Sequence, residues 1–367
     1  MQVLVVNAGS SSLKVSVLGP DDELRMDVEV AVSDPASIGD VLEEAVRGAP
    51  PADAAGHRVV HGGAELTAPL LLGGGDDERL ERLADLAPLH NPPALAAIRR
   101  LQALRPGMPE VACFDTAFHA TMPAASSTYA LPEAWAALGL RRFGFHGLSH
   151  AWASRRAAGL LGRSPQRLRL VTAHLGAGAS LAAVAGGVSV DTTMGFTPLE
   201  GLVMATRAGS VDPGLLVWVL RHEGLTVDEL EDALTRRAGL LGLSGSADLR
   251  RVIEAADEGD ERGALAYDVY LHRLRGGVAA MAAAMGGTDG LVFTGGAGEH
   301  SARLRRDACE GLGFLGLVVD DARNDAAGGD GRDAVVSPGD AHAAVVVVHA
   351  REDLEIARQV RAVLAVT

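Results

Sequence analysis

Two stretches of the chain share one pattern, in which a short apolar run, a Gly/Ser-rich turn and a second apolar run follow each other. The first stretch covers residues 3–18 around Asn-Ala-Gly-Ser-Ser-Ser, and the second covers residues 170–185 around His-Leu-Gly-Ala-Gly-Ala-Ser. Such runs predict strands, and glycine-rich turns between strands bring several backbone N–H groups close to phosphate oxygens. Because the pattern opens each half of the chain, we interpret it as a duplicated α/β unit that holds a phosphate between the copies.

Composition narrows the function classes. With 367 residues, of which 48% are hydrophobic, the chain is long enough for two domains. A formal charge of −14 argues against nucleic-acid and anionic-membrane partners, because both favour basic surfaces. The two cysteines, Cys113 and Cys309, are expected to be buried thiols in a reducing compartment. We recognise neither a leader peptide nor an apolar run of about 18 residues, so we expect a cytoplasmic protein without a membrane span.

Strands alternate with helices along the chain, which predicts a largely parallel α/β arrangement. Besides the two hairpins, strands are expected at 24–30, 56–63 (a short strand ending in glycines), 111–115, 188–190, 291–294 and 343–348. Helices are expected at 38–47, 151–161, 227–237, 248–256, 263–285, 301–311 and 352–364.

Three further segments carry local predictions. Asn91 precedes two prolines and is expected to cap a helix that ends near residue 104. Residues 73–77 are expected to form an exposed loop, and residues 321–340 a polar Gly/Asp-rich loop without evident chemistry.

Lys14 is the only lysine of the chain, and every other basic residue apart from histidine is an arginine. A general replacement of lysine by arginine suggests that the retained lysine does something that a guanidinium cannot. A compact charge in a tight phosphate turn is such a role.

Eight motifs occur in one order along nearly the whole chain, from Asn7 to Ala357. They read NAGSSSLK, HRVVHGG, PLHNPP, FDTAFH, RRFGFHGLSH, the long stretch with TMGFTPLEGL and TR-G-DPG, GGAGE, and REDLEIA. Together they resemble the acetate kinase family of the acetate and sugar kinase/Hsp70/actin superfamily. The resemblance implies an α/β fold of two actin-like (ribonuclease H-like) domains with the active site in the interdomain cleft. Domain I would comprise residues 1–118 and 352–367, and domain II residues 119–351.

The resemblance also implies a reaction, the reversible transfer of the ATP γ-phosphoryl group to a short carboxylate. A carboxylate needs no deprotonation before it attacks, so such a site needs alignment and positive charge more than a general base. By resemblance, Arg58 would hold the substrate carboxylate, Arg207 would steady the transferring phosphoryl group, and His146 would donate to one of its oxygens. Asp115 resembles the catalytic aspartate of the family, which could orient the substrate or an arginine.

The remaining site residues are carried over from the matching motifs. His90, Val60, Leu89, Phe145 and Pro198 match the family's substrate pocket. The ATP-binding positions are Lys14, His174, Leu175, Gly176, Ala177, Gly178, Asp248, Leu249, Arg250, Gly296, Ala297, Gly298, Glu299 and His300. Asn7 and Glu352 match the family's ligands for Mg²⁺, with Mn²⁺ as the alternative ion. The family forms homodimers, so a homodimer is implied.

The chain departs from the family pattern on the nucleotide and metal side only. Ala177 stands where the phosphate turn usually has asparagine, His300 where asparagine follows the glutamate, and Leu249 where an aromatic residue is common. The C-terminal Asn-Glu-Glu has become Arg-Glu-Asp at 351–353. These changes affect donor binding, whereas the carboxylate side is intact.

Three alternatives stay open. A propionate or butyrate kinase would share nearly every motif, since one methylene changes binding by only about 1–3 kcal/mol. A nucleotide-binding switch or structural protein would not need Arg58, Arg207 and His146 together. An altered phosphoryl donor, such as pyrophosphate, or an inactive paralogue would agree with the change at Ala177.

Overall fold

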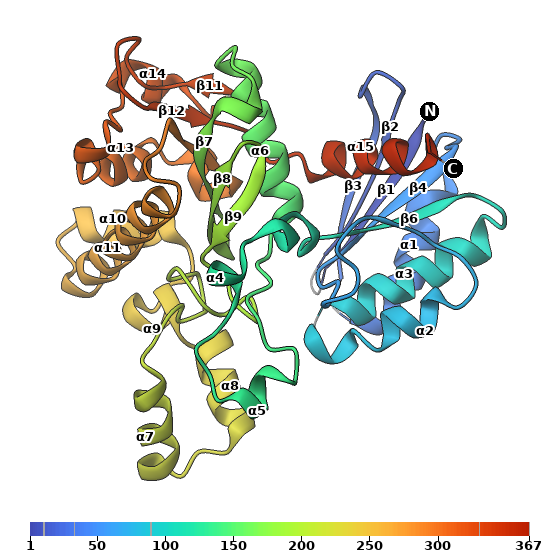
Figure 1. Ribbon diagram of the computed structural model, residues 1–367, viewed down its shortest axis with the longest axis horizontal. Helices are drawn as coiled ribbons and strands as arrows, with labels where there is room; N and C mark the ends of the chain where they lie inside the picture. Colours follow the sequence, from blue (N-terminus) through green and yellow to red (C-terminus); the bar gives the residue numbers. More distant parts are fainter. Residues whose placement is uncertain (10–11, 33, 89, 330, 367) are drawn as a thin grey trace. The chain divides into compact units, whose positions relative to one another are not determined.

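A computed structural model describes residues 1–9, 12–32, 34–88, 90–329 and 331–366. The chain forms two compact units (Figure 1). The first unit contains residues 1–120, 145–152 and 351–367, and the second contains residues 121–144 and 153–350. Residues 145–152 belong to the first unit. The domain boundaries expected from the sequence assigned them to the second.

The first unit is built on a mixed sheet with the strand order β3-β2-β1-β4-β6-β5. Its strands are β1 (Val3–Ala8), β2 (Ser12–Leu18), β3 (Leu24–Ala31), β4 (Ala54–Val59), β5 (Leu70–Leu71) and β6 (Glu110–Phe114). The meander β1-β2-β3 is antiparallel, β1, β4 and β6 are parallel, and β5 is a short antiparallel edge strand.

Helices cover both faces of this sheet. Its helices are α1 (Ile38–Arg47), α2 (Asp76–Glu81), α3 (Asn91–Leu104) and α15 (Glu352–Leu364). Because side chains alternate along a strand, Leu4 and Val6 of β1 pack with α1 and α3, whereas Val3 and Val5 pack with α15. The unit is therefore a three-layer sandwich, whose C-terminal helix is an integral part of the core.

The second unit repeats the topology of the first. Its sheet has the order β11-β12-β10-β7-β8-β9. Its strands are β7 (Arg169–Leu175), β8 (Ala179–Ala185), β9 (Val188–Thr192), β10 (Gly290–Thr294), β11 (Ala334–Val335) and β12 (Ala344–Val347). Each strand matches one of the first sheet in position and direction, from the antiparallel meander to the short edge strand inserted before the last parallel strand. The predicted duplication of an α/β unit is confirmed.

More helices surround the second sheet. They are α4 (Ala124–Ser127), α5 (Glu133–Ala136), α7 (Pro213–Glu223), α8 (Val227–Arg236), α9 (Gly239–Ser244), α10 (Leu249–Asp257), α11 (Glu261–Ala284), α12 (Gly295–His300), α13 (Ala302–Glu310) and α14 (Asp321–Ala326). The long helix α11 packs on β7, β8 and β9 and also contacts α9, α10 and α13. Helix α6 (Gly147–Leu160) begins in the first unit. Within the described ranges, no helix combines the length and the hydropathy that a membrane span needs.

Three local predictions from the sequence were wrong. Asn91 is the first residue of α3 and does not cap it, because its side chain is engaged by the main chain of His61 and Leu83. Helix α2 begins at Asp76, inside the expected loop 73–77. The expected loop 321–340 contains α14 and β11; Asp320 caps α14, and Asp321 and Asp325 of α14 accept hydrogen bonds from Arg306.

A close backbone contact fixes the corner after β6. Gly147 donates its N–H to the carbonyl oxygen of Asp115 at 3.0 Å. A Cβ atom at residue 147 would lie 2.0 Å from that oxygen. The preceding residue, His146, has φ +55°, a left-handed conformation that is uncommon outside glycine.

We expect Gly147→Ala to destabilise the protein by about 1–3 kcal/mol, because the new methyl group cannot fit against the Asp115 carbonyl. Thermal unfolding measures the effect as a lowered Tm. Gly159→Ala is the matched control in the same helix, since a Cβ at residue 159 meets no atom within 4 Å. It should be neutral or stabilising by up to about 1 kcal/mol. Equal Tm values for the two variants would contradict the close contact.

His119 makes stability depend on pH. Burial lowers the pKa of His119 to about 4, and its Nε2 donates to the carbonyl oxygen of Phe145 at 3.0 Å. The pKa in the unfolded chain is higher, so stability is fully present above about pH 6.5 and is lost as the pH falls toward 4. A shift of this size corresponds to about 3 kcal/mol.

We therefore expect His119→Gln, which retains an N–H donor, to flatten the fall of Tm between pH 7 and pH 4 relative to the wild type. Thermal melts at a series of pH values measure this slope. If Tm falls equally with pH in the two proteins, protonation of His119 does not contribute to the loss of stability.

Candidate functional site

Four polar side chains meet in the first unit. Asn7 lies in β1, Arg58 in β4, Asp115 directly after β6, and Glu352 at the start of α15. The Nε and Nη2 atoms of Arg58 donate to the two carboxylate oxygens of Asp115 at 3.2 and 2.6 Å. Its Nη1 donates to Oδ1 of Asn7 at 3.2 Å, and the Asn7 amide donates to Glu352 at 3.3 Å. The Arg58 cluster therefore gathers side chains from three parallel strands and one helix.

The charges of the Arg58 cluster depend on each other. Burial disfavours the charged form of Arg58, but the carboxylates of Asp115 and Glu352 outweigh it and raise the pKa of the guanidinium. Burial also raises the pKa of Asp115, an effect that the Arg58 guanidinium opposes. With a bidentate ion pair at these distances, we assign a negative Asp115 and a positive Arg58 at neutral pH.

Arg58 keeps donors for a ligand. The contacts with Asp115 and Asn7 use one hydrogen on each of Nε, Nη1 and Nη2, so one hydrogen on each of the two Nη atoms has no partner among the described residues. A guanidinium held in this way can bind both oxygens of a carboxylate or two oxygens of a phosphate.

The strained corner lies beside the Arg58 cluster. The backbone N–H of His146 donates to the Asp115 carboxylate. Phe145 is buried and forms an edge-to-face contact with His61, with ring centroids 5.4 Å apart. The carbonyl of Phe145 accepts a hydrogen bond from His119. The Phe145 backbone and its aromatic ring are therefore both held in place, next to the strained residue His146.

The other residues predicted for the substrate pocket are distributed over both units. Val60 is buried directly after β4, and His90 is the residue before α3. Leu89 lies outside the described residues. Pro198 and Arg207 belong to the second unit, where Nη1 of Arg207 donates to the Pro198 carbonyl at 3.1 Å. Burial lowers the pKa of Arg207, although the guanidinium stays charged near neutral pH.

The chemistry of the predicted metal ligands agrees with a hard cation. Asn7 and Glu352 offer an amide oxygen and a carboxylate, and the carboxylate of Asp115 lies in the same cluster. Two carboxylates face one guanidinium, so the Arg58 cluster carries excess negative charge. Within the described part of the chain, no three His, Cys, Asp or Glu side chains form a complete metal site. Mg²⁺ needs few protein ligands when phosphate and water supply the rest.

A cavity of about 560 Å³ lies in the second unit. It is lined by Gly176, Ala177, Ala205, Leu240, Ala247, Asp248, Leu249, Arg250, Ile253, Tyr270, Gly296, Ala297, His300 and Ser301. These residues come from the turn after β7, the loop around Ala205, helix α9, helix α10 with the residues just before it, the middle of α11, and helix α12 with the residue after it. The volume lies within the range typical of small-molecule sites. Many of the predicted ATP-binding residues are thus brought together in one cavity, called the donor cavity below.

The remaining predicted ATP-binding residues do not line the donor cavity. His174 and Leu175 are the last residues of β7, and Gly178 and Gly298 lie beside lining residues. The buried Glu299 carboxylate accepts the backbone N–H groups of Gly295 and Ala350. Lys14 belongs to the first unit, where its half-exposed side chain pairs with Glu29 at 2.9 Å.

A buried arginine holds one wall of the donor cavity. The fully buried guanidinium of Arg305 donates to the carbonyls of Gly298 and Glu299 and to the carbonyls of Asn324 and Ala327. Its Nε also donates to the side-chain carbonyl of Asn324 at 2.7 Å. Burial lowers the pKa of Arg305 to about 10, so it remains charged at neutral pH. Arg305 therefore ties helix α12 to the C-terminal end of α14 and the residue that follows it.

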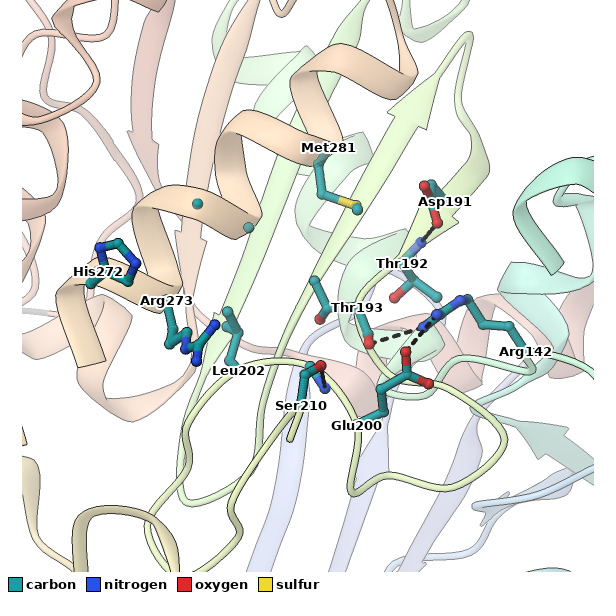
Figure 2. Close-up of a pocket in the computed structure, with 13 residues that line it drawn as sticks. Arg142, Asp191, Thr192, Thr193, Glu200, Leu202, Ser210, His272, Arg273 and Met281 are labelled. Carbon is teal, nitrogen blue, oxygen red and sulfur yellow. Dashed lines mark hydrogen bonds and ion pairs between the residues drawn. The ribbon is translucent and has the colours of Figure 1, made fainter. Parts of the chain in front are cut away.

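A second cavity of the second unit, about 330 Å³, contains none of the predicted site residues (Figure 2). In its wall, Arg142 donates to the carbonyls of Thr193 and Met194 and pairs with Glu200 at 2.6 Å. The hydroxyl of Tyr129 donates to the same Glu200 carboxylate. This network holds the loop that carries Pro198.

Sequence reasoning missed four of these residues. Arg305 occurs in an ordinary polar helix pattern, and Tyr270 looks like a core residue of α11. Glu200 was quoted only as part of a motif. Only the RRFGFHGLSH and TMGFTPLEGL motifs could have suggested that Arg142 and Glu200 form a pair.

Comparisons with known proteins agree with this geometry. The chain matches the Acetokinase family over residues 36–358. It is 50% identical to the acetate kinase of Gloeobacter violaceus over 306 residues, which cover 83% of this chain and 75% of that protein.

Two solved structures resemble the whole chain. The acetate kinase of Porphyromonas gingivalis superposes with a TM-score of 0.90 at 36% identity, covering 99% of both chains. A propionate kinase from Francisella tularensis superposes with a TM-score of 0.88 at 33% identity, covering 98% of both. With the repeated sheets, the Arg58 cluster and the donor cavity, these matches lead to one conclusion: the chain belongs to the acetokinase family, whose fold is α/β with two domains.

Proposed function

We propose that this protein is an acetate kinase, which transfers the γ-phosphoryl group of ATP to acetate and catalyses the reverse reaction. The observation that carries the proposal is the Arg58 cluster, in which Asp115 holds the guanidinium and leaves one hydrogen on each Nη atom for a carboxylate. A switch or structural protein of the same fold would have no use for such a carboxylate fork.

The acceptor needs orientation rather than activation. A carboxylate is already ionised at neutral pH, so no residue has to remove a proton before it attacks phosphorus. Asp115 keeps the planar fork of Arg58 in one orientation, and the fork aligns the substrate oxygens. Asp115 is thus a positioning residue for Arg58 and takes no proton in the reaction.

The donor cavity is the proposed ATP site. The turn at Gly176 and Ala177 would receive the phosphates on backbone N–H groups. In the reaction, an acetate oxygen forms a bond to the γ-phosphorus, and the bond from that phosphorus to the bridging oxygen breaks, so ADP leaves with the electron pair. Arg207 and His146 would neutralise charge on the transferring group.

We propose Mg²⁺ as the metal of this reaction, bound to phosphate oxygens and to Asn7 and Glu352. When bound, it offsets phosphate charge. The excess negative charge of the Arg58 cluster supports this choice, because the cation would balance the second carboxylate.

Acetate is the proposed acid, and propionate is the second candidate because the chain also resembles a propionate kinase. Val60 and Phe145 are buried and apolar, as a methyl-binding pocket requires. One methylene changes binding by only about 1–3 kcal/mol in such a pocket, so both acids belong in any assay. The use of ATP and two unpaired, buried cysteines favour the cytoplasm as the place of action.

We propose that two copies of the chain associate through helix α7. None of its residues is buried, although Leu215, Val217 and Trp218 are large and apolar. In Figure 1, α7 lies well away from the sheet of its unit. An exposed apolar helix surface of this kind is typical of an interface. The same helix of a second copy, related by a twofold axis, would bury it.

Purified protein with MgATP and hydroxylamine should form acyl hydroxamate from acetate, with less from propionate and least from butyrate. Arg58→Ala should lower kcat/KM for acetate by about 100-fold or more, because the carboxylate loses its charged partner. Arg47→Ala is the control, since this exposed arginine of the first unit makes only a loose contact with Glu43 at 3.7 Å.

Pyrophosphate replaces ATP in a parallel assay, which tests the altered-donor alternative. Product from pyrophosphate but not from ATP would overturn the proposed donor. No product from any acid with either donor would overturn the proposed activity.

Trp218→Glu should convert the protein from a dimer to a monomer of 37.8 kDa, because it places a charge in the apolar contact. Light scattering after size-exclusion chromatography measures the mass. Leu24→Glu changes an equally exposed apolar residue in β3 and should leave the dimer intact. A wild-type monomer, or a dimeric Trp218→Glu variant, would contradict the proposed surface.

A further inference from the structure

Tyr270 carries an unused hydrogen-bonding group in the donor cavity. The residue is 4% exposed and lines the cavity from the middle of α11. Its hydroxyl makes no hydrogen bond within the described part of the chain, and its oxygen is not among the unpartnered atoms that the protein fully encloses. Buried hydroxyl groups nearly always have a partner, so this one points to a ligand or to water.

The helices that pack against α11 indicate which part of a nucleotide Tyr270 would meet. Leu240 of α9 and Leu249 and Ile253 of α10 line the same cavity, and both helices contact α11, so this side of the lining is largely apolar and suits a flat base. The polar pair Asp248 and Arg250 suits ribose hydroxyls better. The glycine turn after β7 remains for the phosphates.

A second tyrosine of α11 shows what a structural hydroxyl looks like here. Tyr267 is also buried, but its hydroxyl donates to the carboxylate of Asp307 at 2.8 Å and does not line the cavity. Burial raises the pKa of Tyr270, so its phenol stays protonated at neutral pH and is available as a donor or an acceptor. The two tyrosines lie about one helical turn apart, but the hydroxyl of Tyr267 has a structural partner and that of Tyr270 does not have one among the described residues.

We propose that the Tyr270 hydroxyl forms a hydrogen bond with the base of the bound nucleotide and contributes to the choice of donor. The inference rests on the proposed function in one respect, namely that the donor cavity binds a nucleotide. Tyr270 would then be a side chain that hydrogen-bonds to the base, in a part of the cavity where the other lining groups near the base are small and apolar.

The test is the affinity of Tyr270→Phe for MgADP, measured by calorimetric titration without any turnover. Removal of one neutral hydrogen bond should raise the Kd for ADP about 3- to 10-fold. Inorganic tripolyphosphate has no base, so its Kd should be unchanged. The same penalty should appear with 2′,3′-dideoxy-ADP, because the bond does not involve the ribose hydroxyls.

Tyr267→Phe is the matched control and should bind ADP within about twofold of the wild type while its Tm falls, since it loses an internal hydrogen bond. Tyr270→Phe should keep the wild-type Tm, because its hydroxyl makes no hydrogen bond to any of the residues that the structure describes.

Three results would overturn the inference: an unchanged ADP affinity in Tyr270→Phe, an equal loss for tripolyphosphate, or a penalty that disappears with the dideoxy nucleotide. A wild-type protein that does not bind ADP would overturn it as well. A protein that binds ADP through Tyr270 but forms no acyl phosphate would remove the proposed activity and leave the base contact in place.

Discussion

The bidentate ion pair between Arg58 and Asp115 is the interaction on which the first unit's site depends. Neither residue could be buried alone at low cost, because an isolated charge in the interior is strongly disfavoured. The same Asp115 accepts the N–H of His146 with its side chain and that of Gly147 with its backbone. One residue after β6 thus fixes both the Arg58 guanidinium and the strained corner that leads into α6.

Duplication explains where the chemistry lies. Ligands of open α/β sheets meet the carboxyl ends of parallel strands, and both units use these ends. The first unit places side chains there, with Asn7 near the end of β1 and Arg58 near the end of β4. In the second unit, the equivalent strands β7 and β10 lead into Gly176 and Gly295 instead. One copy therefore provides charged groups for the proposed acceptor, and the other provides open backbone for the proposed donor.

The sequence predicted the helices and strands well, because the spacing of their apolar residues reflects which face of each element is buried. The range of α1 and that of α15 agree with the structure to the residue. It failed where long-range contacts decide, as at Asn91, whose side chain is used by His61 rather than by its own helix. Motifs located the Arg58 cluster by resemblance, but no pattern in the sequence distinguishes Tyr270 from Tyr267, because only packing decides which hydroxyl finds a partner.

The contacts of Arg305 have a consequence for engineering the protein. Segment 324–328, the end of α14 and the residues after it, would be chosen on composition as a harmless surface site for a tag or an inserted domain. Its carbonyls, however, are bound by Arg305, Gly328 accepts from His300, and a Cβ at Gly328 would lie 2.0 Å from the Glu299 carbonyl. An insertion at this point would disturb the hydrogen bonds that hold helix α12. Because α12 lines the donor cavity, fusion partners should be attached elsewhere on the molecule.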